Sequence, residues 1–455
     1  MFTISSLSVL ALLAAFWLRD CPSLEAIVSC CSKQGAGITT HGSTSIHIPA
    51  GFAKIFANPR VNWLSQSEPA PNLNDRIMYQ PRGKVLGGTS SINGMVYMRG
   101  NRADYDEWVQ RGCEGWGFDS VLPYFRRAED NELGEDDFHR IGGPLHVSDP
   151  PRWELGHLLL KACVQAGIPH NPDFNGAGQD GAGYYQTTIN AGRRWSTAAA
   201  YLRPARSRSN LIVLTRAHAT RILIVDGKAV GVEFRTRDGL STAYANGEII
   251  VSAGVFGSPQ LLLLSGVGPG QHLQNMGIPV VYHLRGVGSN LQEHFHLSCA
   301  WRIKRPLSMN VLHRSIPHQF MAGLKYMLRR SGPLASSGFY AGAFVRSDPR
   351  LERPDLQLHL IAWSGMRRSS KGIIPHPFPT FGISPVHLRP EGRGTVRLKG
   401  RDPLVQPEIR FNFLCSEYDV RAVLAGIRLA RKIASQDALR DLVAEEVLPG
   451  ETLER

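Results

Sequence analysis

The segment from Arg82 to Met95 has the residue types that can hold a cofactor against the polypeptide backbone. Without a Cβ atom, the main chain can approach a pyrophosphate or a flat ring closely, and consecutive amide groups can form an anion-binding concavity. An ordinary turn before a helix remains an alternative explanation for the Gly-Gly-Thr-Ser-Ser string. The fourteen positions hold four glycines and four small polar residues: Gly83, Gly87, Gly88, Gly94, Thr89, Ser90, Ser91 and Asn93.

A second segment combines a β-branched run with a helix signal. Residues 248–251 lead to Gly254 and predict a strand. Ser258 and Pro259 then open the apolar stretch 261–264, which predicts a helix capped by Ser258 with Pro259 in its first turn. A helix N-terminus beside a sheet favours a bound phosphate. For the leucines at 261–264, a plain strand-to-helix crossover that packs them into the core is the expected explanation.

Other strands are predicted around these two segments. Two runs with alternating apolar character follow the Arg-Trp-Ser-Thr string at 194–197. These predicted strands are 211–214 and 217–222.

At its full length, the first segment resembles the first signature of the glucose-methanol-choline (GMC) oxidoreductases. It reads G-K-x-L-G-G-T-S-S-x-N-G-M, followed by R-G-N at 99–101 and D-Y-D-x-W at 104–108. Residues 257–268, G-S-P-Q-L-L-x-x-S-G-V-G, are similar to the second signature. Blocks at 286–294 and 388–413 also resemble the family, so the resemblance runs from about Ile46 to the end.

This resemblance implies an α/β fold with two interleaved domains. An FAD-binding, Rossmann-like domain is expected over 46–300, with segments of the substrate domain inserted in it. The substrate domain, built on an antiparallel sheet, is expected over 301–455 and is expected to be incomplete. By the resemblance, the runs 338–346, 355–360 and 394–398 are predicted to be strands of this domain. The family's proton-accepting His, with its His or Asn partner, lies beyond the last block matched here. We therefore assign no catalytic residue, and we expect His294 to be structural.

The resemblance also implies which residues contact FAD. Ile92 stands where some members carry a His that tethers the flavin, so FAD is expected to be held noncovalently. Ala219 is expected beside the adenine. No metal site is expected, because the cysteines lack metal-type spacing. The expected cofactor-binding residues are Val85, Gly87, Gly88, Thr89, Asn93, Gly94, Met95, Val96 and Ala219.

Residues 1–45 do not fit the family's strand and G-x-G-x-x-G turn. Read from the third base of each codon, possible codons for residues 2–18 can spell HDLIVVGAGSAGCVLA, which contains that fingerprint. We hypothesise an out-of-frame translation of the dinucleotide-binding unit, with the frame restored just before Ile46. The nucleotide sequence of the gene tests this, and the apolar run 7–18 then needs no secretory role.

By resemblance, the expected function is FAD-dependent oxidation of choline or another primary alcohol to the aldehyde, with hydride transfer to the flavin. The chain as given is expected to be impaired, because it departs from the family at both ends. The expected partners are a small alcohol and an electron acceptor such as a quinone or a carrier protein. A hydroxynitrile-lyase-type enzyme of the same fold and a noncatalytic binding or structural protein are the alternatives.

Composition and charge bear on three further classes of protein: nucleic-acid binders, membrane proteins and secreted proteins. The chain carries 51 Lys and Arg against 38 Asp and Glu, but the charges are interspersed, which disfavours a nucleic-acid partner. No stretch reaches the roughly 20 apolar residues of a membrane span. No basic residue precedes the run 7–18, which disfavours secretion. We expect a cytoplasmic protein with free thiols, and peripheral attachment to the inner membrane is the alternative.

Overall fold

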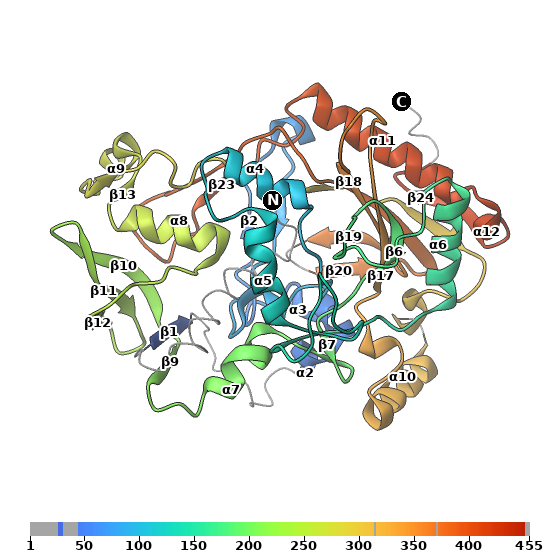
Figure 1. Ribbon diagram of the computed structural model, residues 1–455, viewed down its shortest axis with the longest axis horizontal. Helices are drawn as coiled ribbons and strands as arrows, with labels where there is room; N and C mark the ends of the chain where they lie inside the picture. Colours follow the sequence, from blue (N-terminus) through green and yellow to red (C-terminus); the bar gives the residue numbers. More distant parts are fainter. Residues whose placement is uncertain (1–25, 31–43, 314, 370–371, 451–455) are drawn as a thin grey trace.

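The computed structural model describes residues 26–30, 44–313, 315–369 and 372–450. A large antiparallel sheet lies on one side of the molecule with helices α6 (Glu154–Gln165), α11 (Glu417–Ala434) and α12 (Asp437–Arg440) (Figure 1). Smaller sheets lie on the other side with helices α8 (Gly254–Leu264) and α9 (Gly270–Asn275). The out-of-frame hypothesis for residues 1–45 falls largely outside the described residues. Among the described helices, none is long and apolar enough to cross a bilayer.

The large sheet has the strand order β24–β16–β21–β18–β17–β6, and β15 also pairs with β21. Every pair in it is antiparallel, as predicted for the substrate domain. β17 and β18 confirm the strands predicted at 338–346 and 355–360. The strands are β6 (Gly181–Tyr184), β15 (Phe295–His296), β16 (Ala300–Ile303), β17 (Phe339–Val345), β18 (Leu356–Ile361), β21 (Thr380–His387) and β24 (Val443–Leu448).

Helices α6 (Glu154–Gln165), α11 (Glu417–Ala434) and α12 (Asp437–Arg440) accompany this sheet. Ser416 caps α11 by accepting a hydrogen bond from the amide of Asp419 at 3.1 Å. Acidic residues in the first turn of α11 and basic residues in its last turn match the helix dipole. Residues of α6 and α11 meet buried strand residues in one core, which includes Leu155, Leu159, Ala343, Leu358, Phe381, Ala430 and Ile433.

The other side of the molecule contains the two strands predicted after residue 210. β1 (Ala26–Cys30) pairs in parallel with β9 (Leu211–Thr215). An antiparallel meander follows, made of β10 (His218–Val225), β11 (Lys228–Arg235) and β12 (Leu240–Tyr244). The strands predicted at 211–214 and 217–222 are therefore confirmed as β9 and β10.

The strand predicted at 248–251 is wrong, and so is the predicted helix start. α8 begins at Gly254 and runs to Leu264, so Ser258 and Pro259 lie inside it and Ser258 is not its cap. A strand of a parallel sheet is stabilised by neighbours that cover it, and no described strand pairs with this run. Ile250 is accordingly 54% exposed.

The remaining elements lie within, between or around these two parts. The strand predicted at 394–398 appears as β22, in a separate two-stranded sheet with β23. These elements are α2 (Thr44–His47), α3 (Phe52–Ile55), β2 (Ser65–Gln66), β3 (Tyr79–Gln80), α4 (Arg102–Gln110), α5 (Phe118–Ala128), β4 (Glu129–Asn131), β5 (Leu145–Val147), β7 (Ile189–Asn190), β8 (Arg193–Arg194), α7 (Arg203–Ala205), β13 (Val267–Gly268), α9 (Gly270–Asn275), β14 (Tyr282–His283), α10 (Ile316–Arg329), β19 (Gly365–Ser369), β20 (Gly372–Pro375), β22 (Thr395–Arg397) and β23 (Glu408–Arg410).

A buried ionic cluster fixes the chain just after the first signature. The guanidinium of Arg99 meets the carboxylate of Glu129 at 2.7 Å, and both side chains are almost fully buried. His139 lies between Glu129, at 3.1 Å, and Asp173, at 2.9 Å. Burial alone would lower the pKa of His139, but hydrogen bonds with Asp173 and Glu129 raise it from 6.5 to about 9.

This cluster predicts a pH-dependent stability. The folded-state pKa of His139 lies above its unfolded value, so the protonated imidazole contributes its full stabilisation below pH 6.5. That contribution is lost as the pH rises through about 9. Urea unfolding across this pH window should show a falling free energy of unfolding, and the slope should flatten in His139→Gln. An unchanged slope in the variant would assign the pH dependence to other groups.

Candidate functional site

The first signature forms a tight turn in which two glycines take positive φ angles. Gly87 and Gly88 have φ angles of +84° and +54°. A Cβ atom on Gly87 would lie 2.6 Å from the Ser91 hydroxyl and 3.1 Å from the Cβ atom of Ala198. A Cβ atom on Gly88 would meet no described atom within 4 Å. The turn is therefore closed on the Gly87 side and open at Gly88.

The hydroxyl groups of this turn hold the loop itself together. The Thr89 hydroxyl accepts a hydrogen bond from the amide of Gly83 at 3.1 Å. The Ser90 hydroxyl accepts one from the amide of Thr197 at 3.0 Å. Because these side chains are occupied within the protein, the backbone around Gly88 is the surface that the turn offers to a cofactor.

Arg194 is the residue that joins this turn to the rest of the site. Its guanidinium donates hydrogen bonds to the carbonyl of Ile46 at 2.9 Å, to the carbonyl of Ser90 at 3.0 Å and to Oδ1 of Asn93 at 2.8 Å. Burial lowers the pKa of Arg194 to about 9, so it stays cationic at neutral pH. Its Nη2 atom is buried and has no partner among the described residues. A positive group thus lies beside Asn93 with one donor unused.

An aromatic wall continues from the turn into the large sheet. A Cβ atom on Gly94 would lie 3.4 Å from the ring of Phe339, in β17. That ring meets His359, in β18, edge-on at 5.8 Å between centroids. Phe52 lies between Phe339, at 5.9 Å, and Trp363, at 6.0 Å. The flavin-contacting turn expected from the sequence therefore borders a wall of aromatic side chains from the large sheet.

Two histidines near this wall are held neutral. Burial lowers the pKa of His359 to about 4, and the Tyr185 hydroxyl contacts its Nδ1 atom at 3.1 Å. Burial also lowers the pKa of His294 to about 3. Among the residues that the structure describes, the backbone of Leu388 is the one hydrogen-bond partner that raises this pKa. Neither ring nitrogen of His294 has a hydrogen bond of ordinary geometry with the described residues. The structural role expected for His294 stays a prediction.

The other predicted residues of the first signature pack beneath the turn. Val85 and Ile92 lie in one small core, so the position of the tethering His is an apolar packing site. Met95 is fully buried, and Val96 forms a bridge with Thr187. These residues therefore fix the backbone of the turn through packing.

Ala219 lies in β10, away from the turn along the chain, but a series of contacts links the two regions. The ammonium of Lys84 lies 4.2 Å from the ring centroid of Trp63. That ring in turn meets His218 edge-on at 5.9 Å between centroids. The structure therefore connects the strand of Ala219 with the segment that precedes the turn, through Trp63, which the sequence did not single out.

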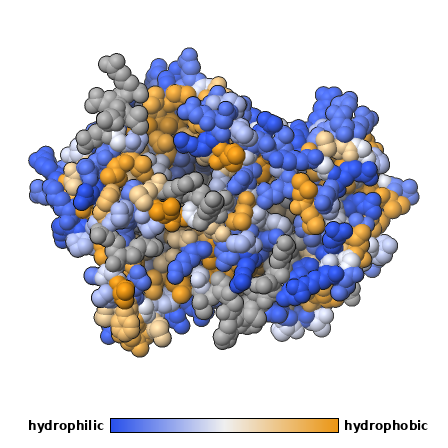
Figure 2. All heavy atoms as spheres, turned by 180° about the vertical axis from the view of Figure 1, so that it is seen from behind, coloured by the Kyte–Doolittle hydropathy of each residue, from blue (hydrophilic) through white to orange (hydrophobic). Residues whose placement is uncertain are grey.

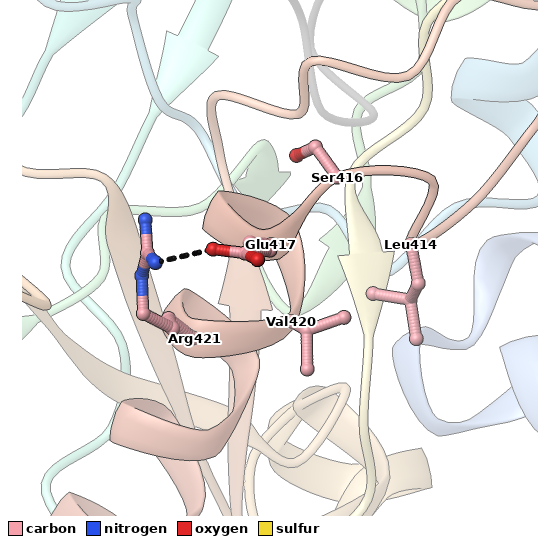
Figure 3. A pocket seen from close by; sticks show the side chains of 5 residues that line it. All are labelled: Leu414, Ser416, Glu417, Val420 and Arg421. Atoms are coloured by element: carbon pink, nitrogen blue, oxygen red, sulfur yellow. Dashed lines mark hydrogen bonds and ion pairs between the residues drawn. The ribbon is translucent and has the colours of Figure 1, made fainter.

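A surface pocket of about 470 Å³ lies elsewhere, at the start of α11 (Figure 3). Glu417 and Arg421 pair across one side of it at 3.0 Å, and Ser416, which lines it, is the helix cap. None of the predicted cofactor-binding residues lines this pocket. Its residues are explained by helix capping and by an exposed ion pair.

The site fits the flavin expected from the sequence. A Cβ atom on Gly88 would meet no described atom within 4 Å, so the backbone there is open to a ligand, and the unused donor of Arg194 beside Asn93 suits an acceptor atom of a flavin. No group of His, Cys, Asp and Glu able to hold a metal ion occurs among the described residues. Arg194, Phe339 and His359 lie in segments that match the family, but they were not predicted as site residues, because they lie far along the chain from the turn.

Comparisons with known proteins identify the family of this chain. The N-terminal profile of the GMC oxidoreductase family matches residues 26–296, and the C-terminal profile matches residues 390–455. The first match begins at residue 26 and includes β1, which is earlier than the start near Ile46 that we expected for the resemblance.

The most informative relatives are choline dehydrogenases. The oxygen-dependent choline dehydrogenase of Rhizobium johnstonii is 41% identical over 415 residues, which are 89% of this chain and 73% of that protein. The mitochondrial choline dehydrogenase of Homo sapiens is 37% identical over 412 residues, which are 90% of this chain and 68% of that protein.

Solved structures confirm the α/β fold. A variant of formate oxidase from Aspergillus oryzae superposes with a TM-score of 0.87 at 24% identity, covering 98% of this chain and 82% of that one. Pyridoxine 4-oxidase from Mesorbium loti gives a TM-score of 0.83 at 24% identity, covering 97% and 81%. Motifs, fold and relatives agree, and the chain belongs to the GMC oxidoreductase family, whose members bind FAD.

Proposed function

We propose that this protein is an FAD-dependent oxidoreductase that oxidises choline or another primary alcohol to the aldehyde. The observation that best supports this proposal is the open turn at Gly88. Arg194 and Asn93 lie beside this turn, and the aromatic side chains of Phe339 and His359 border it. The choline dehydrogenases among its relatives support this substrate class. We also propose a quinone or a carrier protein as the electron acceptor and a cytoplasmic location.

The residues present suggest how the cofactor is held. Bound FAD supplies the acceptor for the hydride that leaves the alcohol carbon. Gly88 leaves room for the ring, and Arg194 places a positive charge beside Asn93. Ile92 is apolar and cannot form a covalent link, which supports noncovalent binding. We also propose that the cofactor is held weakly, because residues 1–45 carry no recognisable G-x-G-x-x-G turn.

His359 is the residue best placed to orient the alcohol. The Tyr185 hydroxyl donates to the carbonyl of Leu358 at 3.2 Å, so it can accept a hydrogen bond from Nδ1 of His359. In that tautomer Nε2 is the acceptor through which the neutral imidazole can bind a hydroxyl. The pKa of about 4 keeps this imidazole unprotonated at neutral pH.

The aromatic wall supports the substrate class. The ring centroid of Phe52 lies 5.9 Å from that of Phe339 and 6.0 Å from that of Trp363. Aromatic faces attract a quaternary ammonium through the ring quadrupole, and they also cover an uncharged alkyl chain. The wall is therefore compatible with choline and with a neutral primary alcohol.

The experiment is to reduce the flavin with alcohols. The purified chain is loaded with FAD, its visible spectrum is recorded, and choline or an uncharged primary alcohol is added without oxygen. Bleaching by an alcohol supports the proposal, and the two alcohols separate a cationic from a neutral substrate. Bound flavin that no alcohol reduces would favour the lyase alternative. Failure to hold flavin, even after correction of the reading frame, would favour a noncatalytic protein.

Replacing His359 with Gln is expected to lower the rate of flavin reduction by about 100-fold. The amide keeps a polar group in place but does not accept a proton as imidazole does. The rate is measured by anaerobic stopped-flow absorbance at saturating alcohol, beside the matched variant His157→Gln on the exposed face of α6. Equal rates in both variants would remove His359 from the reaction.

A further inference from the structure

Helix α10 exposes an unusual set of large apolar side chains. Ile316 is 80% exposed, Phe320 67%, Met327 75% and Leu328 74%. Met321 and Leu324 are also exposed. Contiguous exposed apolar side chains of this kind on a soluble domain indicate a surface for interaction.

The apolar side chains lie on the face of α10 that points away from the protein. Ala322 and Tyr326 are its buried residues, and the Tyr326 hydroxyl donates to the carbonyl of Gly192 at 3.0 Å. The spacing of Ile316, Phe320 and Leu324 places them on one face of a helix with about 3.6 residues per turn. A surface helix ordinarily turns its polar face to solvent, whereas α10 exposes large apolar side chains beside its polar ones.

This apolar face forms a visible patch on the molecule. α10 projects at the lower right of Figure 1, and the orange surface at the lower left of Figure 2, seen from behind, lies over it. The helix is held at both ends: Ser315 caps its start, and Arg330 ends it in the left-handed conformation. It is therefore a fixed feature of the surface.

The charged residues in the stretch of chain that contains α10 are all basic. Eight Lys and Arg residues and no Asp or Glu lie between Glu293 and Asp348. Lys325 and Arg329 flank the apolar face, and Arg330 follows directly. The whole chain has a net charge of +13, from 51 basic and 38 acidic residues. The partner of this face must therefore accept both apolar side chains and positive charge.

We propose that α10 docks the protein on the surface of an anionic lipid bilayer. Its apolar residues would lie at the boundary between headgroups and acyl chains, while Lys325, Arg329 and Arg330 meet anionic headgroups. A second copy of this chain fits less well, because a symmetric contact through α10 would bring the same basic residues together. The proposal does not depend on the alcohol-oxidising function.

The test uses the full chain and sedimentation with vesicles. One set of vesicles contains phosphatidylcholine only, and the other also contains phosphatidylglycerol. We expect binding to the anionic vesicles that weakens as salt is raised. The double variant Phe320→Gln with Met327→Gln should lower the partition coefficient about 10-fold or more. Because both side chains are exposed, the melting temperature should change little.

Controls separate this patch from exposed apolar residues in general. Leu240→Gln with Tyr244→Gln removes two exposed side chains from β12 and should leave vesicle binding unchanged. Lys325→Gln with Arg329→Gln should weaken binding to the anionic vesicles and reduce its salt dependence. Absence of binding to anionic vesicles, equal binding of the Phe320 and Met327 double variant, or equal binding to both vesicle types would each overturn the proposal. So would self-association that this double variant abolishes, since the occupant would then be a second copy.

Discussion

Replacing Arg194 with Met is expected to abolish flavin retention and to lower the free energy of unfolding by about 3 kcal/mol. The methionine fills similar space, but the carbonyls of Ile46 and Ser90 and the side chain of Asn93 lose their charged donor. Buried acceptors without partners are costly, and the loop that carries the turn is then released. The measurements are flavin absorbance per protein after gel filtration and urea unfolding without added flavin.

The neighbouring residue provides the control for this prediction. Arg193 is exposed and points to the opposite side of the strand, so Arg193→Met should keep both flavin and stability. If Arg194→Met loses stability but retains flavin, then Arg194 supports only the fold. If it keeps both, the guanidinium contributes nothing essential to the turn.

Removal of the Glu129 carboxylate is expected to cause the second large loss in the free energy of unfolding. Glu129→Ala leaves the buried guanidinium of Arg99 without its counter-charge, which costs about 3–5 kcal/mol. Urea unfolding at pH 7 measures this loss. Replacing both partners together, with Arg99→Met and Glu129→Leu, should cost less, because no unpaired charge remains buried.

A surface ion pair serves as the comparison. Glu135 meets Arg126 at 3.6 Å, with a half-exposed carboxylate. Glu135→Ala should change the free energy of unfolding by about 0–1 kcal/mol. A Glu129→Ala loss no larger than this would show that water or a rearranged side chain compensates Arg99.

The elements that could be predicted are those with a local pattern. The strands predicted at 211–214 and 338–346 appear as β9 and β17, and each has a partner strand. The run at 248–251 has equally strong strand propensity, but propensity does not supply a partner strand, and no described strand pairs with it. Whether such a run becomes a strand therefore depends on a partner strand, which the local sequence pattern does not reveal.

The candidate site divides in the same way. The glycines at 87 and 88 could be predicted, because the close contact with Ala198 and the positive φ angles constrain the residue type directly. Arg194 and His359 could not, because each is brought to the turn by folding and neither lies at a spacing that signals a role. Single residues that are far apart along the chain form no periodic pattern from which their contact could be predicted.

The large sheet also has a consequence for how this protein reaches its native state. Its strand pairs join Gly183 to Gly342 and Ala300 to Leu448, which are far apart along the chain. Such non-local pairings raise the relative contact order and slow folding, because loop-closure entropy must be lost before the contacts form. During synthesis, β16 leaves the ribosome long before β24, so the edge of β16 that pairs with β24 stays unpaired until β24 has been made. Chaperones that shield this edge should raise the yield of folded protein.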